Sequence, residues 1–317
     1  MTSSSVVTLG ETMALMRTTE IGSLRHVGDL RLGIGGAESN VAIGLARLGV
    51  SVSWLGRVGD GPMGERVLRE IRGEGVATHG IVDPDAPTGL MVKERPSASS
   101  TAVIYYRAAS AGSRLVASDL PAGWIEDASL LHITGITPLL SASAKDAVHA
   151  AVDRARAAGT TVSFDVNYRS ALAGAEVAGP VLRELAERAD IVFGGVDELG
   201  ILYPGTSTGG AASLLHAAGC ATVVVKLGPG GAAVHVGEEV VTAPGFVIDA
   251  VDTVGAGDAF VAGYLSALLD GLDLEAVLRR ANACGAMACL VPGDWEAAPT
   301  RRELERFLTG DADPVRR

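Results

Sequence analysis

Short runs of β-branched and aliphatic residues alternate with longer amphipathic runs through most of this 317-residue chain. Alternation of this kind is typical of a mostly parallel sheet with helices on both faces. The chain is 48% hydrophobic, which is enough to bury both faces of such a sheet. We therefore predict strands over residues 6–10, 52–56, 130–135, 161–166, 191–193 and 222–226, and helices over 39–48, 64–73, 144–158, 181–188, 256–269, 274–289 and 302–308.

Two stretches, residues 12–34 and 87–112, contain strand-like runs with no helix between them. Their period-two alternation, clearest over residues 101–107, predicts a small sheet with one solvated face. We expect this sheet to form a lid that closes over the site. The main α/β domain would then comprise residues 1–11, 35–86 and 113–311, followed by a loose tail over 312–317.

Charge and composition narrow the possible partners. The formal net charge of −11, with no basic stripe, argues against a nucleic-acid partner. Cys220, Cys284 and Cys289 lack metal-ligand spacing and cannot form a complete disulfide set, so buried, reduced thiols are expected. The N-terminus has no basic n-region, and the uncharged run 281–293 is too short to cross a bilayer. We expect a cytoplasmic protein with no membrane partner.

Residues 252–260 read Asp-Thr-Val-Gly-Ala-Gly-Asp-Ala-Phe and lead into a predicted helix. The glycines allow several N–H groups to converge at a helix N-terminus, which suits an anion. Asp258 lies at the rim of that anion site. A carboxylate there can take the proton from a hydroxyl that attacks a phosphoryl group. On its own, the pattern fits an ordinary Asp in a first helical turn equally well.

A second glycine cluster, Gly35-Gly36-Ala37-Glu38-Ser39-Asn40, precedes a predicted helix. It allows close backbone approach to a ligand, although helix capping by Ser39 or Asn40 explains it as well. After another strand, Gly228-x-Gly230-x-x-Ala233 formally matches a dinucleotide fingerprint. That fingerprint requires a following helix, whereas residues 233–236 are predicted to form a strand. A dehydrogenase is therefore the weakest hypothesis.

Two further segments offer cationic side chains. Asp165-Val-Asn167-Tyr-Arg169 comes at the predicted carboxyl end of a strand, where open parallel sheets bind ligands. Arg169 can clamp a carboxylate or steady a phosphate, or instead form an internal ion pair with Asp165. In the lid, Tyr105 and Arg107 share a strand face and can meet a polyhydroxylated anion, or can simply form an exposed cationic edge.

The clusters at 35–42 and 252–260 resemble the two signatures of the ribokinase-like (PfkB) carbohydrate kinases. Three more segments resemble the 2-keto-3-deoxygluconate kinases of that family: Tyr-Tyr-Arg-x-x-Ser-Ala-Gly-Ser at 105–113, Asp-Val-Asn-Tyr-Arg at 165–169 and Gly-Asp-x-Glu at 293–296. The likeness covers residues 5–308. It implies the ribokinase-like fold, a three-layer α/β/α arrangement around a mostly parallel sheet, with a small β-sheet lid.

The resemblance also implies roles for individual residues. Asp258 would be the catalytic base, and Glu198 would act on a metal through water. Substrate contacts would come from Gly36, Tyr105, Arg107, Arg169 and Asp294. Nucleotide contacts would come from Asn167, Lys226, Gly228, Gly231, Gly255, Ala256, Gly257 and Asn282.

Two positions depart from the family pattern. Met91 stands where such kinases tend to have Tyr after Thr-Gly-Leu, which removes a hydroxyl from the sugar pocket and leaves the exact sugar open. Gly195 replaces the Asn of an Asn-x-x-Glu element that keeps Glu198.

We therefore expect phosphorylation, dependent on ATP and Mg²⁺, of a primary hydroxyl on a small acidic sugar. The leading candidate is 2-keto-3-deoxygluconate, giving its 6-phosphate. A fructokinase or a 5-dehydro-2-deoxygluconate kinase is the alternative within the family, and a non-catalytic sugar-binding regulator is a weaker one. A requirement for a monovalent cation near Asp252 is left open. The free edges of a small lid sheet predict a homodimer formed through the lid.

Overall fold

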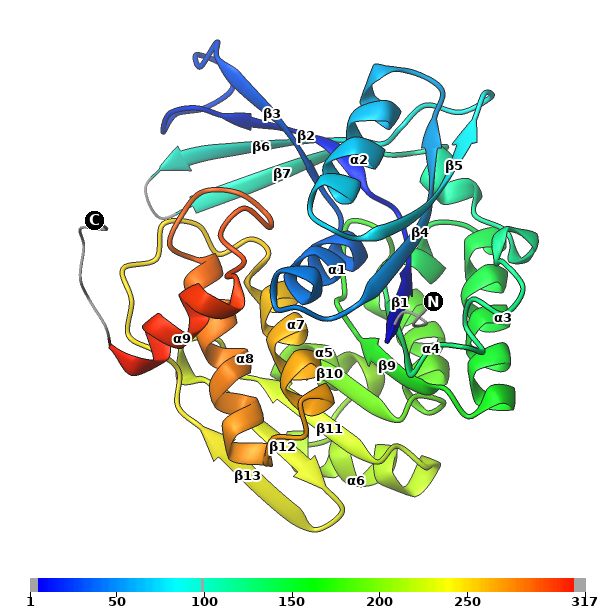
Figure 1. Ribbon diagram of the computed structural model, residues 1–317, viewed down its shortest axis with the longest axis vertical. Coiled ribbons are helices and arrows are strands. Elements are labelled where there is room, and N and C mark those ends of the chain that lie inside the picture. The colour runs from blue at the N-terminus through cyan, green and yellow to red at the C-terminus, as the bar shows by residue number, and fades with distance from the viewer. Residues whose placement is uncertain (1–4, 98–99, 311–317) are drawn as a thin grey trace.

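The computed structural model describes residues 5–97 and 100–310, which form three layers with a large sheet in the middle (Figure 1). Within these residues the sheet has nine strands in the order β13-β12-β11-β10-β9-β8-β1-β4-β5. It is parallel from β11 to β5, and β12 and β13 are added antiparallel at one edge. The strands are β1 (Val6–Leu9), β4 (Val52–Gly59), β5 (Ala77–Asp83), β8 (Leu130–Thr134), β9 (Thr161–Asp165), β10 (Ile191–Gly195), β11 (Thr222–Lys226), β12 (Ala232–Val236) and β13 (Glu239–Ala243).

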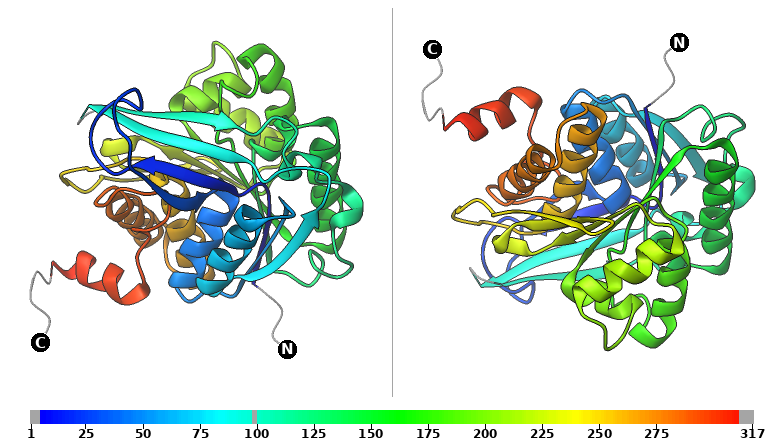
Figure 2. Two further views of the ribbon diagram at one scale, coloured as in Figure 1. Left: turned by 90° about the horizontal axis from the view of Figure 1, so that it is seen from above. Right: turned by 90° about the horizontal axis from the view of Figure 1, so that it is seen from below.

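Helices cover both faces of this sheet, and each face buries its own apolar core (Figure 2). Consecutive strand residues alternate between the two cores, as Val6 and Val7 do, which is expected for a strand buried on both sides. One face carries α3 (Ala142–Ala158), α4 (Ala175–Ala186), α5 (Val196–Leu202) and α6 (Thr208–Ala218). The other carries α1 (Ala37–Arg47), α2 (Pro62–Gly73), α7 (Ala256–Leu269) and α8 (Leu274–Ala288), and α9 (Arg301–Thr309) packs on α8.

The small sheet lies beside α1 and α2, at the top of Figure 1, in the strand order β3-β2-β6-β7. Its central pair, β2 with β6, is parallel, and the outer pairs are antiparallel. One face buries a cluster that includes Leu15 and Met91, whereas Ile104 and Tyr106 are 41% and 62% exposed. The expectation of one solvated face is confirmed. The strands are β2 (Met13–Thr18), β3 (Leu30–Gly35), β6 (Leu90–Ser97) and β7 (Ser100–Tyr106).

The predicted fold class is confirmed, and most predicted elements are found within a few residues of their expected ends. Among the described strands and α-helices, four were not predicted, namely β5, β13, α5 and α6. α6 begins Thr208-Gly209-Gly210, and two glycines lower helix propensity; its burial of Ala211, Ala212 and Leu215 outweighs that cost. α4 starts at Ala175 and not at residue 181, because Pro180 is accommodated inside the helix.

The division into a main domain and a lid remains a prediction, and the predicted tail over 312–317 lies outside the described residues. The three cysteines are free and buried. In the described part of the chain, we find no helix with both the length and the apolar character needed to cross a membrane.

Candidate active site

The segment before α7 forms a tight turn that leads into the helix. Gly255, the N-cap of α7, has φ +80°, and a Cβ atom built on it would lie 1.8 Å from the carbonyl oxygen of Asp294. Glycine is therefore required there both for its backbone conformation and for space. Since the first N–H groups of a helix have no intrahelical acceptors, this turn is suited to hold an anion.

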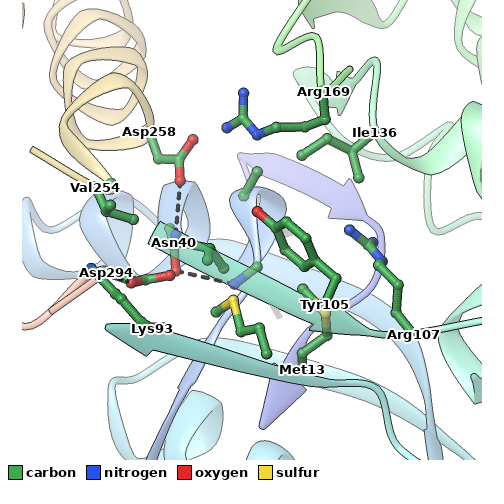
Figure 3. Close-up of a pocket in the computed structure, with 15 residues that line it drawn as sticks. Met13, Asn40, Lys93, Tyr105, Arg107, Ile136, Arg169, Val254, Asp258 and Asp294 are labelled. Carbon is green, nitrogen blue, oxygen red and sulfur yellow. Dashed lines mark hydrogen bonds and ion pairs between the residues drawn. The ribbon is translucent and has the colours of Figure 1, made fainter. Parts of the chain in front are cut away.

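Asp258 lies in the first turn of α7 and is 6% exposed. Its carboxylate accepts a hydrogen bond from Asn40 Nδ2 at 2.8 Å (Figure 3) and another from Asn167 Nδ2 at 3.2 Å. Burial raises the pKa of Asp258 to about 7, although the Asn40 hydrogen bond and the charge of Arg169 oppose the rise. A carboxyl group with a pKa near neutrality is well matched to general base catalysis.

All the predicted substrate contacts line one cavity of about 70 Å³ between α1, α7 and the small sheet. In Figure 3, the guanidinium groups of Arg107 and Arg169 lie on one side of this cavity, and Lys93 and Asp294 lie on the other. Met91 also lines it. The lining therefore includes Asp258 together with Gly36, Tyr105, Arg107, Arg169 and Asp294.

The two arginines differ in their partners. Arg107 forms an ion pair with Glu11, with Nη2 2.5 Å from Oε2, and its guanidinium carbon lies 5.7 Å from the centre of the Tyr105 ring. Arg169 donates to the carbonyl oxygen of Tyr168 at 3.1 Å. The alternative Asp165–Arg169 ion pair is not what forms, because Asp165 pairs with Lys226 at 2.7 Å. Arg169 thus presents its charge to the cavity.

A second cavity, of about 530 Å³, lies on the other side of the α7 N-terminus. Much of its lining is apolar and includes Phe246, Ile248 and Phe260, which suits a flat aromatic group. Six of the predicted nucleotide contacts line it: Lys226, Gly228, Gly231, Ala256, Gly257 and Asn282. Gly255 and Asp258 line the smaller cavity, so the segment 255–258 borders both.

Asn167, the remaining predicted nucleotide contact, lines neither of these two cavities. It is 4% exposed, has φ +40°, and donates to Asp258 and, at 3.4 Å, to Asp165. Strand β9 ends at Asp165, so Asn167 lies in the turn that follows it. Its amide helps to hold the carboxylate of Asp258 in place.

Lys226 and Glu198 lie at the ends of neighbouring elements. Burial opposes protonation of Lys226, but the carboxylates of Asp165 and Glu198 outweigh it and raise the lysine pKa. Glu198 accepts the N–H groups of Tyr168 at 2.9 Å and of Gly195 at 2.7 Å, one on each oxygen. Gly195, where the family pattern has Asn, is thus the N-cap of α5.

Two residues of the site were not assigned from the sequence. Asn40 was considered a helix cap or a ligand contact, yet its amide donates to Asp258, which is 218 positions away. Lys93 lies in the small sheet and pairs with both Asp252 and Asp294. No sequence motif marks either contact, because each joins segments that meet only in the folded chain.

Comparison with known proteins agrees with this geometry. Residues 3–301 match the model of the pfkB family carbohydrate kinases. The chain is 38% identical to a 2-dehydro-3-deoxygluconokinase of Bacillus subtilis (96% of this chain, 95% of the relative) and 35% identical to a 2-dehydro-3-deoxygalactonokinase of Haloferax volcanii (96% of each). It superposes with a TM-score of 0.90 on a putative ribokinase II from E. coli in complex with ATP and Mg²⁺, at 27% identity, covering 97% of this chain and 99% of that one. The chain therefore belongs to the pfkB family of carbohydrate kinases.

Proposed function

We propose that this kinase phosphorylates the primary hydroxyl of 2-keto-3-deoxygluconate to give the 6-phosphate. One observation carries the proposal: a carboxylate with a pKa near 7, Asp258, lines the same cavity as the guanidinium groups of Arg107 and Arg169. A neutral sugar needs a base but no cation, whereas the carboxylate of a sugar acid is also matched by a guanidinium group such as that of Arg169. The Bacillus subtilis relative, a 2-dehydro-3-deoxygluconokinase by name, supports the same substrate.

In the proposed reaction, the sugar lies in the smaller cavity and ATP in the larger one. Asp258 takes the proton of the primary hydroxyl of the sugar. The oxygen of that hydroxyl forms a bond to the γ-phosphorus of ATP, and the bond between this phosphorus and ADP breaks. The N–H groups of residues 255–257 stabilise the negative charge on the phosphoryl group in transit. Lys226, held protonated by its carboxylate neighbours, adds positive charge beside Gly257.

ATP and Mg²⁺ are the proposed cofactors, and the E. coli structure, described as a complex with both, supports them. Magnesium takes oxygen ligands and keeps several waters when it binds to phosphates. Glu198 fits a water-mediated contact, because each of its oxygens accepts one N–H and retains a further lone pair. When bound, the metal would neutralise charge on the ATP phosphates.

Arg169 is the residue with which to test the acidic-sugar proposal. Arg169→Met is expected to lower kcat/KM for 2-keto-3-deoxygluconate about a hundredfold, since it removes a charge-assisted contact, and to affect fructose much less. Steady-state ADP release with each sugar measures both values. Arg154→Met is the matched control, because Arg154 of α3 pairs with Glu126 and lines neither cavity.

The same assay separates the alternatives. Equal kcat/KM for fructose and the keto acid in the wild-type protein would contradict the acidic-sugar proposal, and a clear preference for fructose would identify a fructokinase. Preference for 5-dehydro-2-deoxygluconate would identify that alternative, and no ADP release with any sugar would favour a sugar-binding regulator. The 4-epimer, 2-keto-3-deoxygalactonate, belongs in the panel because the Haloferax volcanii relative is a 2-dehydro-3-deoxygalactonokinase by name.

The acid limb of the kcat/KM profile is expected near pH 7. Only the ionised form of Asp258 can accept a proton, and its pKa is raised to about 7. Asn40→Ala removes a hydrogen bond that favours the ionised form, so the limb is expected to move to higher pH. Rates measured across the neutral range test this, and a limb that stays in place in the variant would assign the titration to another group.

We also propose the homodimer through the small sheet. Its outer strands are β3 and β7, and Leu30, Ile104 and Tyr106 are exposed apolar side chains on them. Sedimentation velocity of the wild-type protein tests this assembly, and a monomer at every concentration would contradict it.

A further inference from the structure

Lys93 is a lysine on β6 whose side chain is 3% exposed. Its ammonium nitrogen lies 2.7 Å from Asp252 Oδ2, 3.1 Å from Asp294 Oδ1 and 3.0 Å from the carbonyl oxygen of Gly293. Three acceptors thus match the three hydrogens of the ammonium group. A buried charge is tolerated only when it is paired and hydrogen-bonded, and Lys93 meets both conditions.

Asp252 begins the segment that ends with the base, Asp258. Its Oδ1 accepts the N–H of Val254 at 3.2 Å, and its Oδ2 accepts the N–H of Gly293 at 3.2 Å in addition to Lys93. The carboxylate therefore fastens the start of the anion-binding turn to the loop that follows α8. Lys93 adds a strand of the small sheet to this junction, so three separate parts of the chain meet at one ammonium group.

The surroundings of Asp252 do not fit a bound monovalent cation at its carboxylate. Such an ion takes oxygen ligands, but three oxygens that meet at this point, Asp252 Oδ2, Asp294 Oδ1 and Gly293 O, already bind Lys93, and Asp252 Oδ1 accepts the N–H of Val254. An ion at the same oxygens would also lie within a few ångströms of the ammonium group. Like charges repel strongly at such a distance in a buried site.

We propose that Lys93 is a tethered cation that holds the anion-binding turn in shape, so that this kinase needs no monovalent cation such as K⁺. Lys93 is a positioning residue in this account. It acts through Asp252 on the backbone of residues 252–257, and through Asp294 on the cavity that it also lines. The inference rests on the proposed function, because the shape of that turn matters through phosphoryl transfer. The sequence left open whether a monovalent cation is required near Asp252, and on this proposal none is required.

The first test uses the wild-type protein in buffers of equal ionic strength that contain choline, Na⁺ or K⁺ as the only monovalent cation. Affinity for ADP with Mg²⁺, measured by calorimetry, and kcat are each expected to agree within about twofold, because equal ionic strength gives equal screening. Stimulation by K⁺ over choline of about tenfold or more in either quantity would overturn the proposal. ADP binding requires no sugar, so an incorrect sugar assignment leaves this result interpretable.

The second test uses Lys93→Met, which leaves two buried carboxylates without their cation. We expect kcat to fall about a hundredfold, with K⁺ or NH₄⁺, but not choline, restoring part of the loss and of the melting temperature. Lys93→Arg keeps the charge and is expected to stay independent of K⁺. Lys145→Met, on α3, controls for the loss of a lysine.

A Lys93→Met protein that keeps full activity in choline would contradict the proposal, as would one that folds but responds to no cation. If this variant fails to fold, the wild-type comparison decides the matter by itself.

Discussion

Asp258→Asn is expected to reduce kcat about a thousandfold while making the protein more stable above neutral pH. The loss of rate follows from the loss of the carboxylate that lies in the first turn of α7, beside the anion-binding turn, and lines the cavity of the two arginines. Steady-state kinetics with saturating ATP and sugar measure the loss, and rates near those of the wild type would show that Asp258 is not the base.

The gain in stability follows from the same pKa. A carboxyl group whose pKa rises from 3.8 unfolded to about 7 folded contributes its full stability below the unfolded value and loses it as the pH rises through the folded value. Above pH 7 the folded state thus bears the cost of a buried charge, up to about 4 kcal/mol, which a neutral amide avoids. We expect Asp258→Asn to raise the free energy of unfolding by about 2 kcal/mol at alkaline pH, and less in acid.

Urea unfolding of the wild type and the variant on either side of neutrality measures this difference. Asp270→Asn, at the C-cap of the same helix, is the matched control. The pKa of Asp270 is shifted in the opposite direction, because Arg301 and Arg280 lower it. The control is expected to lose a little stability and to keep its activity. A stability difference for Asp258→Asn that does not change with pH would contradict the raised pKa.

Gly255→Ala is expected to lower kcat/KM about a thousandfold. The added methyl group would lie 1.8 Å from the carbonyl oxygen of Asp294, so either the turn or the loop carrying Asp294 must move. Either shift displaces groups on both sides of the reacting atoms. Steady-state kinetics and thermal unfolding measure the effects on activity and on stability.

Gly271→Ala provides the matched control, since Gly271 has φ +73° but no atom within 4 Å of the position that the added methyl group would take. Both substitutions place alanine in the left-handed region, which costs about 1 kcal/mol. Only the substitution at Gly255 adds a steric clash, between the new methyl group and the carbonyl oxygen of Asp294. If the two variants lose the same activity, the close approach to Asp294 has no part in the reaction.

Those parts of the site whose residues are adjacent in the sequence could be predicted from short sequence patterns. The turn and helix at 252–269 follow from two glycines, an acidic residue and an apolar run, and α7 has the predicted bounds. Similarly, a strand-end motif led to Arg169, whereas Lys226 followed from the family resemblance. The ends of helices were harder: α4 continues through Pro180, and α6 forms despite Gly209 and Gly210, because burial outweighs local propensity.

The contacts that set the chemistry could not be predicted in this way. Asn40 and Asn167 converge on Asp258 from α1 and from the turn after β9, and no spacing along the chain encodes that meeting. The pKa of Asp258 depends on its burial, which exists only once the layers have packed. The partner of Asp165 was also decided by the fold, because Lys226 at the end of β11 lies closer to it than its sequence neighbour Arg169.

The sequence by itself therefore determined the layer architecture, the glycine-rich turn before α7 and the residue types available for catalysis, since each depends on patterns a few residues long. Tertiary structure decided which polar side chains meet: Lys93 with Asp252 and Asp294, Arg107 with Glu11, and Asp258 with two asparagines. The physical reason is that burial and charge pairing act through space, between residues that the chain brings together only when its two sheets have formed and packed.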